Sequence, residues 1–222
     1  MAKPKAAISW SGGKDSCAAL MRAQPEFDVV ATVTMLDEHG TRSRSHGLRP
    51  EILEAQAGQL GLRPFVGHCS WSTYDDAFAD ALTRLPADVT HVVFGDILFD
   101  QHRAWAEAMC RRCRLVAVEP LFGMSTESLF VEWVRSGNEA TIVTLRTGQL
   151  DRSWLGRRLS LDMLDDFRRL GVDPCGEQGE YHTVVTSGSL FRAPLALEFR
   201  ETVQISDCWA IDAALVEPAF ER

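Results

Sequence analysis

The amino-acid sequence predicts an α/β fold in which a Rossmann-like parallel sheet carries a smaller C-terminal α+β lobe. Two observations lead to this prediction. Short stretches rich in β-branched residues alternate with helical segments through the first two thirds of the chain, which is typical of βαβ units. After Leu150 the order changes to one helix followed by three strands. We therefore expect two units, residues 1–148 and 149–222.

The first unit should contain five strands, because five apolar runs are each bounded by polar or turn-forming residues. They cover residues 6–10, 29–36, 64–66, 89–95 and 115–118. Between them, apolar residues recur at the spacing of a helix face, which predicts helices near 15–24, 49–61, 74–85 and 103–113. A further helix near 125–136 and a strand near 140–145 should complete this layer.

The second unit begins with helical spacing around residues 160–170. The following stretch 171–176, Gly-Val-Asp-Pro-Cys-Gly, should end that helix because Gly and Pro interrupt regular structure. Strand-like runs then appear at 183–186, 195–205 and 208–216. No internal repeat or low-complexity linker separates the two units, so they should pack as one body.

Composition and charge limit the classes of function. Apolar residues make up 45% of the 222 residues, and no apolar run approaches the ~18 residues that would span a bilayer. The net charge of −8 at pH 7 argues against nucleic acid as a partner, because phosphate backbones are bound by Lys and Arg. Six cysteines without a secretory leader favour reduced thiols and a cytoplasmic protein with no membrane partner.

A glycine-containing loop, Ser11-Gly12-Gly13-Lys14-Asp15-Ser16, lies between the first predicted strand and the first predicted helix. Unpaired N–H groups and the positive end of the helix dipole meet there, which favours phosphate oxygens. The glycines allow close approach of the backbone, and the serines add hydroxyl donors. Lysine occurs elsewhere only at positions 3 and 5, which singles out Lys14 as a charge for phosphate. Asp15 could cap the helix or hold Mg²⁺.

This loop is not a Walker A motif, which requires Ser or Thr after the lysine where this chain has Asp15. The six residues instead resemble the signature of the PP-loop ATP pyrophosphatases, the superfamily of GMP synthetase, argininosuccinate synthetase and the tRNA thiolases. The resemblance implies the adenine-nucleotide alpha-hydrolase type of fold and cleavage of ATP between its α- and β-phosphates. A substrate oxygen would attack the α-phosphate, pyrophosphate would leave, and a nucleophile would displace AMP. The loop and Mg²⁺ would stabilise the departing charge.

A second motif, Gly-Glu-Gln-Gly-Glu-Tyr-His-Thr at residues 176–183, precedes the first strand of the second unit. Its two glycines frame the carboxylates of Glu177 and Glu180 on a bent loop. Such a pair can bind Mg²⁺, hold an ammonium group or take a proton from attacking ammonia. An ordinary solvated acidic turn is the competing interpretation.

Together with further segments, this octet resembles the diphthine–ammonia ligase family over nearly the whole chain. The other segments are His46-Gly47, Phe94-Gly95-Asp96-Ile97, the helix start Arg103–Trp105, Glu119-Pro120-Leu121-Phe122, Leu155-Gly156-Arg157, residues 171–176 and Ser189-Leu190-Phe191. The resemblance implies ATP-dependent amidation of diphthine on elongation factor 2 with ammonia, releasing AMP and pyrophosphate. The strong preference for Arg over Lys looks bacterial, and bacteria are not expected to make diphthine. A different carboxylate, free or protein-bound, is therefore the alternative acceptor.

The resemblance assigns roles to individual residues. ATP would be held by Ser11, Gly12, Gly13, Lys14, Asp15, Ser16, Gly95 and Asp96. The catalytic residues would be Lys14, Asp15, Glu177, Glu180 and His182, with Asp15 as the Mg²⁺ ligand. The substrate would be bound by His46, Gly176, Glu177, Gly179, Glu180, Tyr181 and Thr183. Because diphthine carries a quaternary ammonium group, Tyr181 and the two glutamates are expected beside it.

Two other functions remain open. Cys110 and Cys113 lie on one face of a predicted helix, and with Cys175 or Cys208 they could hold an iron–sulfur cluster, as in some tRNA thiolases. Two thiols buried in helix packing are the simpler interpretation. The chain could also be an ATP-binding module without turnover, in which case the acidic octet is unexplained. A homodimer is compatible with the sequence.

The tryptophans are expected mainly in the core or between the units, because large aromatic side chains dominate packing. This expectation covers Trp71, Trp105, Trp133, Trp154 and Trp209, and Trp10 should pack beneath the glycine loop.

Overall fold

Five parallel strands form the first sheet of the computed structural model, which describes residues 2–205 and 207–216. They are β1 (Lys5–Ser9), β2 (Asp28–Leu36), β3 (Arg63–His68), β4 (Val89–Val93) and β5 (Val116–Val118). Their order is β3-β2-β1-β4-β5, the order of a doubly wound nucleotide-binding sheet. The carboxyl ends of all five strands therefore meet at one edge, with β1 in the middle.

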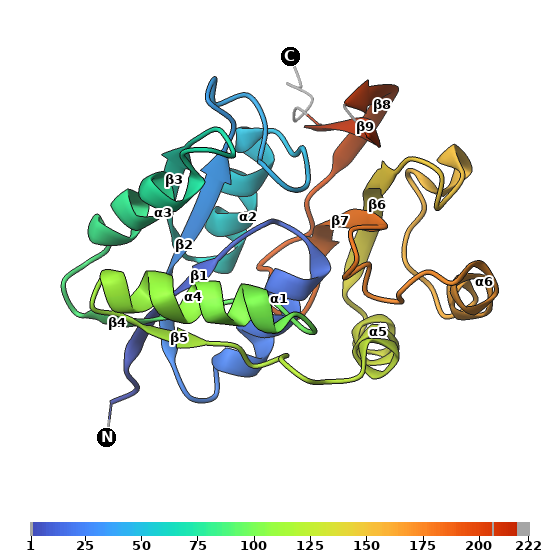
Figure 1. Cartoon of the computed structure of the whole chain (residues 1–222). Coiled ribbons are helices and arrows are strands. Elements are labelled where there is room, and N and C mark those ends of the chain that lie inside the picture. The colour runs from blue at the N-terminus through green and yellow to red at the C-terminus, as the bar shows by residue number, and fades with distance from the viewer. Residues whose placement is uncertain (1, 206, 217–222) are drawn as a thin grey trace, which may run out of the picture.

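Helices cover both faces of this sheet (Figure 1). On one face lie α1 (Lys14–Ala23) and α2 (Pro50–Leu60), and on the other lie α3 (Tyr74–Thr83) and α4 (Asp100–Arg112). Side chains alternate along each strand, so Ala6 and Ile8 of β1 pack towards α1, whereas Ala7 packs into the cluster around α3 and α4. The predicted α/β class is confirmed, and the first five strands and first four helices predicted for this layer are present.

The second sheet has four strands in the order β7-β6-β9-β8. The elements after β5 are α5 (Thr126–Arg135), β6 (Glu139–Arg146), a 3₁₀ turn (Arg152–Trp154), α6 (Met163–Leu170), β7 (Tyr181–Ser187), β8 (Leu197–Ile205) and β9 (Cys208–Leu215). All pairings in this sheet are antiparallel. This is the smaller lobe that the sequence predicted.

The prediction that α5 and β6 complete the parallel layer is wrong. Strand β6 pairs with β7 and β9, and α5 packs on α6 through an edge-to-face contact of Phe130 with Phe167, with ring centroids 5.6 Å apart. The change of sheet therefore falls between Val118 and Glu139. The division of the chain at residues 148 and 149 stays a prediction.

The two sheets share one hydrophobic cluster. It runs from β1 and α1 through α5, β6 and α6 to Tyr181 and Val185 of β7. The backbone N–H of Val185 also donates to the carbonyl of Gly12, 2.9 Å away, which ties β7 to the glycine loop. The units pack as one body, as the absence of a linker indicated.

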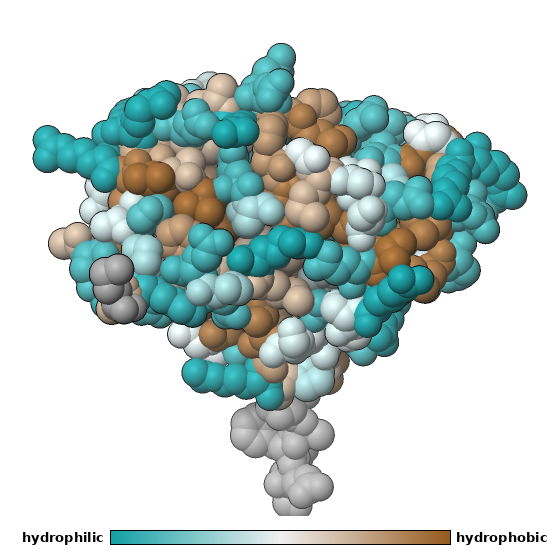
Figure 2. Space-filling model, turned by 90° about the horizontal axis from the view of Figure 1, so that it is seen from below, coloured by the Kyte–Doolittle hydropathy of each residue, from teal (hydrophilic) through white to brown (hydrophobic). Residues whose placement is uncertain are grey.

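The surface is mixed in character. In Figure 2, hydrophobic residues form several separate patches between hydrophilic ones on the face that is shown. Within the described part of the chain, every helix is too short or too polar to cross a membrane.

Candidate active site

A cleft of about 470 Å³ lies at the carboxyl edge of the parallel sheet, between the two units. Its volume is in the range of small-molecule sites. Ten of the predicted site residues line it: Ser11, Asp15, Ser16, His46, Gly95, Asp96, Gly176, Glu177, Gly179 and His182. The glycine loop, the end of β4 and the acidic octet, which are far apart in the sequence, therefore meet in one cavity. Gly12, Gly13, Lys14, Glu180, Tyr181 and Thr183 lie outside its lining.

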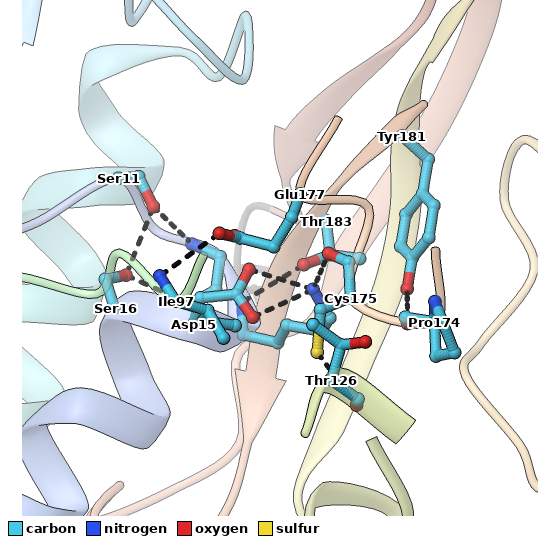
Figure 3. Close-up of polar contacts among 12 residues, drawn as sticks. Ser11, Asp15, Ser16, Ile97, Thr126, Pro174, Cys175, Glu177, Tyr181 and Thr183 are labelled. Carbon is cyan, nitrogen blue, oxygen red and sulfur yellow. Dashed lines mark hydrogen bonds and ion pairs between the residues drawn. The ribbon is translucent and has the colours of Figure 1, made fainter. Parts of the chain in front are cut away.

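The glycine loop is held by its two serines. The Ser11 hydroxyl accepts a hydrogen bond from the Gly13 N–H at 3.3 Å and lies 3.2 Å from the Ser16 hydroxyl, which donates to the Gly13 carbonyl at 3.0 Å (Figure 3). Gly13 is the N-cap residue of α1, so Asp15 does not cap the helix. The first turn of α1 thus opens at the cleft, where its N–H groups can receive an anion.

Three glycines allow segments to approach this loop closely. Gly12 has φ +83°, a backbone conformation that favours glycine. A Cβ atom on Gly13 would lie 2.3 Å from Cε1 of His46, and one on Gly95 would lie 2.9 Å from backbone atoms of Asp15 and Ser16. The end of β4 is therefore pressed against the start of α1.

Lys14 lies behind the loop rather than in the cleft. Its side chain is buried, and its ammonium binds both carboxylate oxygens of Asp15, at 2.8 and 2.9 Å, and the carbonyl of Cys175. It also lies 5.2 Å from the centre of the Tyr181 ring. Burial opposes its charge, but the interaction with Asp15 outweighs this and raises the pKa of Lys14 above its usual value. The expectation that Lys14 supplies charge to a phosphate does not fit this arrangement, because its ammonium already connects the two units.

Three carboxylates belong to the polar lining of the cleft. Asp15, Asp96 and Glu177 line it, and no Lys or Arg does among the described residues. Burial raises the pKa of Asp15, although Lys14 opposes this shift. Asp96 lies 3.0 Å from Nδ1 of His102. This negative lining attracts cations and disfavours a bare triphosphate.

Glu177 connects the octet to the loop after β4. Its Oε2 accepts a hydrogen bond from the backbone N–H group of Ile97 at 3.1 Å (Figure 3) and another from that of Leu98 at 3.3 Å. Burial, reinforced by the charge of Asp15, raises the pKa of Glu177 to about 7. A carboxyl group that titrates near neutral pH can exchange a proton with a reacting group.

Glu180, Tyr181 and Thr183 do not face the cleft, so their predicted catalytic or substrate-binding contacts are not supported. The Glu180 carboxylate is buried and accepts hydrogen bonds from the N–H groups of Asp173 at 2.9 Å and Gln178 at 3.0 Å, which hold the octet in its turn. The Tyr181 ring stacks on Phe167 with 5.5 Å between centroids, and its hydroxyl donates to a carbonyl. Neither side chain is available to a quaternary ammonium group.

Thr183 belongs to the contact between the units. Its hydroxyl accepts a hydrogen bond from the N–H of Lys14 at 3.1 Å, and its carbonyl lies 2.8 Å from Nδ1 of His46. Since a carbonyl can only accept, Nδ1 of His46 carries the proton and Nε2 is left as an acceptor. Thr183 therefore sets the tautomer of a residue that does line the cleft.

His46 and His182 form a ring pair in the cleft wall, with centroids 4.6 Å apart. Burial lowers the pKa of His46 to about 4, and burial together with His46 lowers the pKa of His182 well below its usual value. Both imidazoles are neutral at pH 7, so they can accept hydrogen bonds without adding positive charge.

Asp173 organises the octet, a role that the sequence analysis missed. Its Oδ1 accepts from the N–H groups of Cys175 at 2.8 Å and Glu177 at 3.2 Å, and its Oδ2 accepts from the hydroxyl of Thr126 at 2.7 Å. The available signal was its position before proline in a turn, where Asp commonly binds the backbone that follows.

Gln56 supports the glycine loop from below, which the sequence also did not reveal. Its amide nitrogen donates to the carbonyls of Gly12 at 3.0 Å and Val185 at 2.7 Å, and its oxygen accepts from the Trp10 indole at 2.9 Å. Trp10 is buried and takes part in supporting the loop, as expected.

An aromatic wall forms another side of the cleft. Its members are Trp71, Tyr74, Phe94 and Trp105. Trp71 was expected in the core, but its side chain is 69% exposed and stacks on Tyr74 with 5.9 Å between centroids. It lies in the loop after β3, at the edge where ligands bind in such folds, which explains its exposure.

Of the cysteines expected for a cluster, Cys175 lines the cleft, whereas Cys110, Cys113 and Cys208 do not. Cys110 is fully buried in the hydrophobic cluster around α3 and α4, and the Cys113 thiol donates to the carbonyl of Ala79. Within residues 2–205 and 207–216, no group of three or more His, Cys, Asp or Glu side chains is arranged to hold a metal. The structure thus offers no observation that favours an iron–sulfur site.

Comparison with known proteins shows where this architecture occurs. Residues 4–117 match the family model of the diphthamide synthase N-terminal domain, and residues 125–217 match that of the C-terminal domain. The diphthine–ammonia ligase of Rattus norvegicus is 28% identical over 87% of this chain and 82% of its own length. That of Schizosaccharomyces pombe is 29% identical over 88% of this chain, which spans only 36% of the yeast protein. That of Homo sapiens is 26% identical over 87% of this chain and 82% of its own length.

A solved structure described as a predicted subunit of tRNA methyltransferase from Methanocaldococcus jannaschii superposes with a TM-score of 0.45 and 14% identity, covering 83% of this chain and 98% of that one.

The two family matches together cover both sheets and all the cleft-lining segments. The chain belongs to the diphthamide synthase family.

Proposed function

We propose that this protein is an ATP-dependent ligase that adenylates a substrate carboxylate and then amidates it with ammonia. One observation carries the proposal: the glycine loop that opens α1 and the carboxylate of Glu177 face the same cleft from different units. The relatives named diphthine–ammonia ligase support the ligation of ammonia. A cytoplasmic location is part of the proposal.

The reaction would proceed in two steps, adenylation and then amidation. A carboxylate oxygen of the substrate attacks the α-phosphorus of ATP, and the bond to the pyrophosphate oxygen breaks. The nitrogen of ammonia then attacks the acyl carbon, AMP leaves, and one proton is released. Ser11, Ser16 and the N–H groups of Asp15 and Ser16 in the first turn of α1 would hold the phosphates, since the N–H of Lys14 donates to Thr183. Glu177 would receive the proton, because its pKa of about 7 suits transfer at neutral pH.

Magnesium fits this cleft as a partner of ATP. The lining holds carboxylates and, among the described residues, neither Lys nor Arg, so a triphosphate needs a cation to enter. Mg²⁺ is typically bound by one or two carboxylates together with phosphate oxygens, not by a cage made only of protein groups. Asp15 is the carboxylate beside the glycine loop and would be its ligand, and Mg²⁺ would supply charge neutralisation.

The acceptor is proposed to be the carboxylate of diphthine on elongation factor 2, with another carboxylate as the alternative. A quaternary ammonium group suits the cleft through its carboxylates and its aromatic wall, rather than through Tyr181 and Glu180. Incubation with candidate acceptors, ATP, Mg²⁺ and ammonium, followed by mass spectrometry, would identify the acceptor by the change from acid to amide.

The nucleotide products test the proposed reaction. With an acceptor present, ATP should yield AMP and pyrophosphate, and amide formation should depend on ammonium. Ser16→Ala should lower the rate, whereas Ser128→Ala on α5, outside the cleft, should not. Release of ADP and phosphate would contradict attack at the α-phosphorus. Binding of ATP without turnover in any mixture would instead support a non-catalytic ATP-binding module.

A further inference from the structure

Arg44 lies beside the cleft, and its side chain has no hydrogen-bond or ion-pair partner among the described residues. It follows β2 in the chain, its backbone N–H donates to the Met35 carbonyl at 3.0 Å, and the next two residues, Ser45 and His46, line the cleft. Its guanidinium carbon lies 4.2 Å from the centre of the exposed Trp71 ring, which also lines the cleft. The guanidinium is thereby fixed beside the opening.

The donors of this guanidinium are unused. Its Nε is buried without a hydrogen-bond partner, and its side chain forms no ion pair with any described residue. Nearby arginines differ: Arg42 and Arg49 both bind the carboxylate of Asp212, and Arg103 pairs with Glu107. Among the arginines stacked on aromatic rings in the described chain, Arg44 is the one with a buried, unbonded nitrogen.

A buried donor without a partner is unfavourable, so the arrangement calls for an acceptor from outside the chain. The planar fork of arginine matches a group with two oxygens, a carboxylate or a phosphate, and stacking on Trp71 orients it in advance. The cleft lining has carboxylates but neither Lys nor Arg in the described residues, so Arg44 is the permanent cation placed to receive an incoming anion.

We propose that Arg44 and Trp71 form an oxyanion subsite at the mouth of the cleft. The oxyanion could come from the phosphates of the nucleotide or from the carboxylate of the acceptor. That the anion is a nucleotide phosphate or an acceptor carboxylate rests on the proposed function. That Arg44 binds an anion does not rest on it. In either case the subsite guides a negatively charged group past the carboxylates of the cleft.

The side-chain Nε–Hε signal of Arg44 in a ¹⁵N NMR spectrum tests this subsite directly. Its identity is established by its loss in Arg44→Lys. We expect the signal to shift saturably on titration with magnesium pyrophosphate if the source is phosphate, or with acetate if it is carboxylate. The signal of Arg63, which also stacks on a ring but at the amino end of β3, should not move. An unmoved Arg44 signal with both anions, or equal shifts of both arginines, would overturn the proposal.

Variants measure the strength of the subsite. Arg44→Ala should weaken binding of the effective anion by about tenfold or more, since hydrogen bonds to charged groups are strong. Arg44→Lys should recover only part of this, because an ammonium lacks the fork, and Arg63→Ala should have no effect. An anion affinity unchanged in Arg44→Ala contradicts the subsite even if the protein proves to be a ligase. A shift of the Arg44 signal in a protein without ligase activity would leave the subsite intact and reject the function alone.

Discussion

Lys14 shows how a residue picked out by its sequence context can serve another purpose. Its ammonium is buried between the units, bound by Asp15 and by the Cys175 carbonyl. A compact ammonium with three donors can make these contacts in a confined space where a planar guanidinium would need more room. In the proposed function, the loop would therefore bind phosphate mainly through N–H groups, hydroxyls and a metal ion.

Lys14→Ala should destabilise the protein strongly, because it leaves the carboxylate of Asp15 without its partner. The expected loss is about 3 kcal/mol or more of the free energy of unfolding, the range for breaking a buried ion pair. Lys5→Ala is the matched control, since it removes an exposed pair with Asp88 and should change stability little. Equal urea midpoints for wild type and Lys14→Ala would contradict the anchoring role.

Glu177 should make stability depend on pH. Its pKa of about 7 lies above the ordinary value of 4.5, so between these values the folded state holds more protons than the unfolded state. The contribution of Glu177 to stability is therefore full below about pH 4.5 and is lost as pH rises towards 7. The urea midpoint should decrease between pH 5 and pH 8 by less in Glu177→Gln than in wild type. Glu54→Gln, on the exposed face of α2, should show the same decrease as wild type. Identical slopes in all three proteins would refute this assignment.

Some side-chain orientations were accessible from the sequence and others were not. Alternation along β7 places Tyr181 and Thr183 on one face and His182 on the other, and only His182 of these three lines the cleft. Had the sequence analysis started this strand at residue 181 instead of 183, the alternation would have predicted that Tyr181 and Thr183 point away from the cleft. The inward turn of Glu180 was not accessible, because its partners are backbone N–H groups of a loop whose path no local pattern defines.

At the scale of elements, the contact between the end of β4 and the start of α1 sets the shape of the cleft. Gly95→Ala would place a Cβ atom 2.9 Å from backbone atoms of the first turn of α1, which cannot yield as a flexible side chain can. We expect weaker binding of a magnesium ATP analogue and a lower melting temperature.

The matched control for Gly95→Ala is Gly58→Ala. Gly58 lies inside α2 with open space around its Cβ position, so alanine there should be neutral or stabilising. If both variants bind the analogue like wild type, the close approach of β4 to α1 has no role in the site.

The helices and strands were predictable because each combines clear periodicity with turn-forming residues at its ends. The sheet to which β6 belongs was not, since its partners β7 and β9 come much later in the chain and an apolar strand looks alike in either sheet. Antiparallel pairing depends on tertiary contacts that a local pattern does not contain.

At the scale of the whole molecule, one hydrophobic cluster serves both sheets, and the cleft is built from both units. Neither unit presents a complete site, because the glycine loop comes from one and the acidic octet from the other. Folding of the second unit against α1 is thus a condition for assembling the site.

The shared cluster predicts a single cooperative unfolding transition. Tryptophan fluorescence and far-UV circular dichroism should give the same urea midpoint, as expected for a two-state process. Separate midpoints for the two signals would show that the units fold independently and that the common cluster contributes little to stability.

The central claim is that the loop at residues 11–16 holds the triphosphate of ATP at the floor of this cleft. A crystal structure with Mg²⁺ and α,β-methylene-ATP tests it most directly. We predict phosphate oxygens within hydrogen-bond distance of the Ser11 and Ser16 hydroxyls and of the N–H groups of Asp15 and Ser16, with the α-phosphate turned towards Glu177. A triphosphate bound away from residues 11–16 would contradict the account.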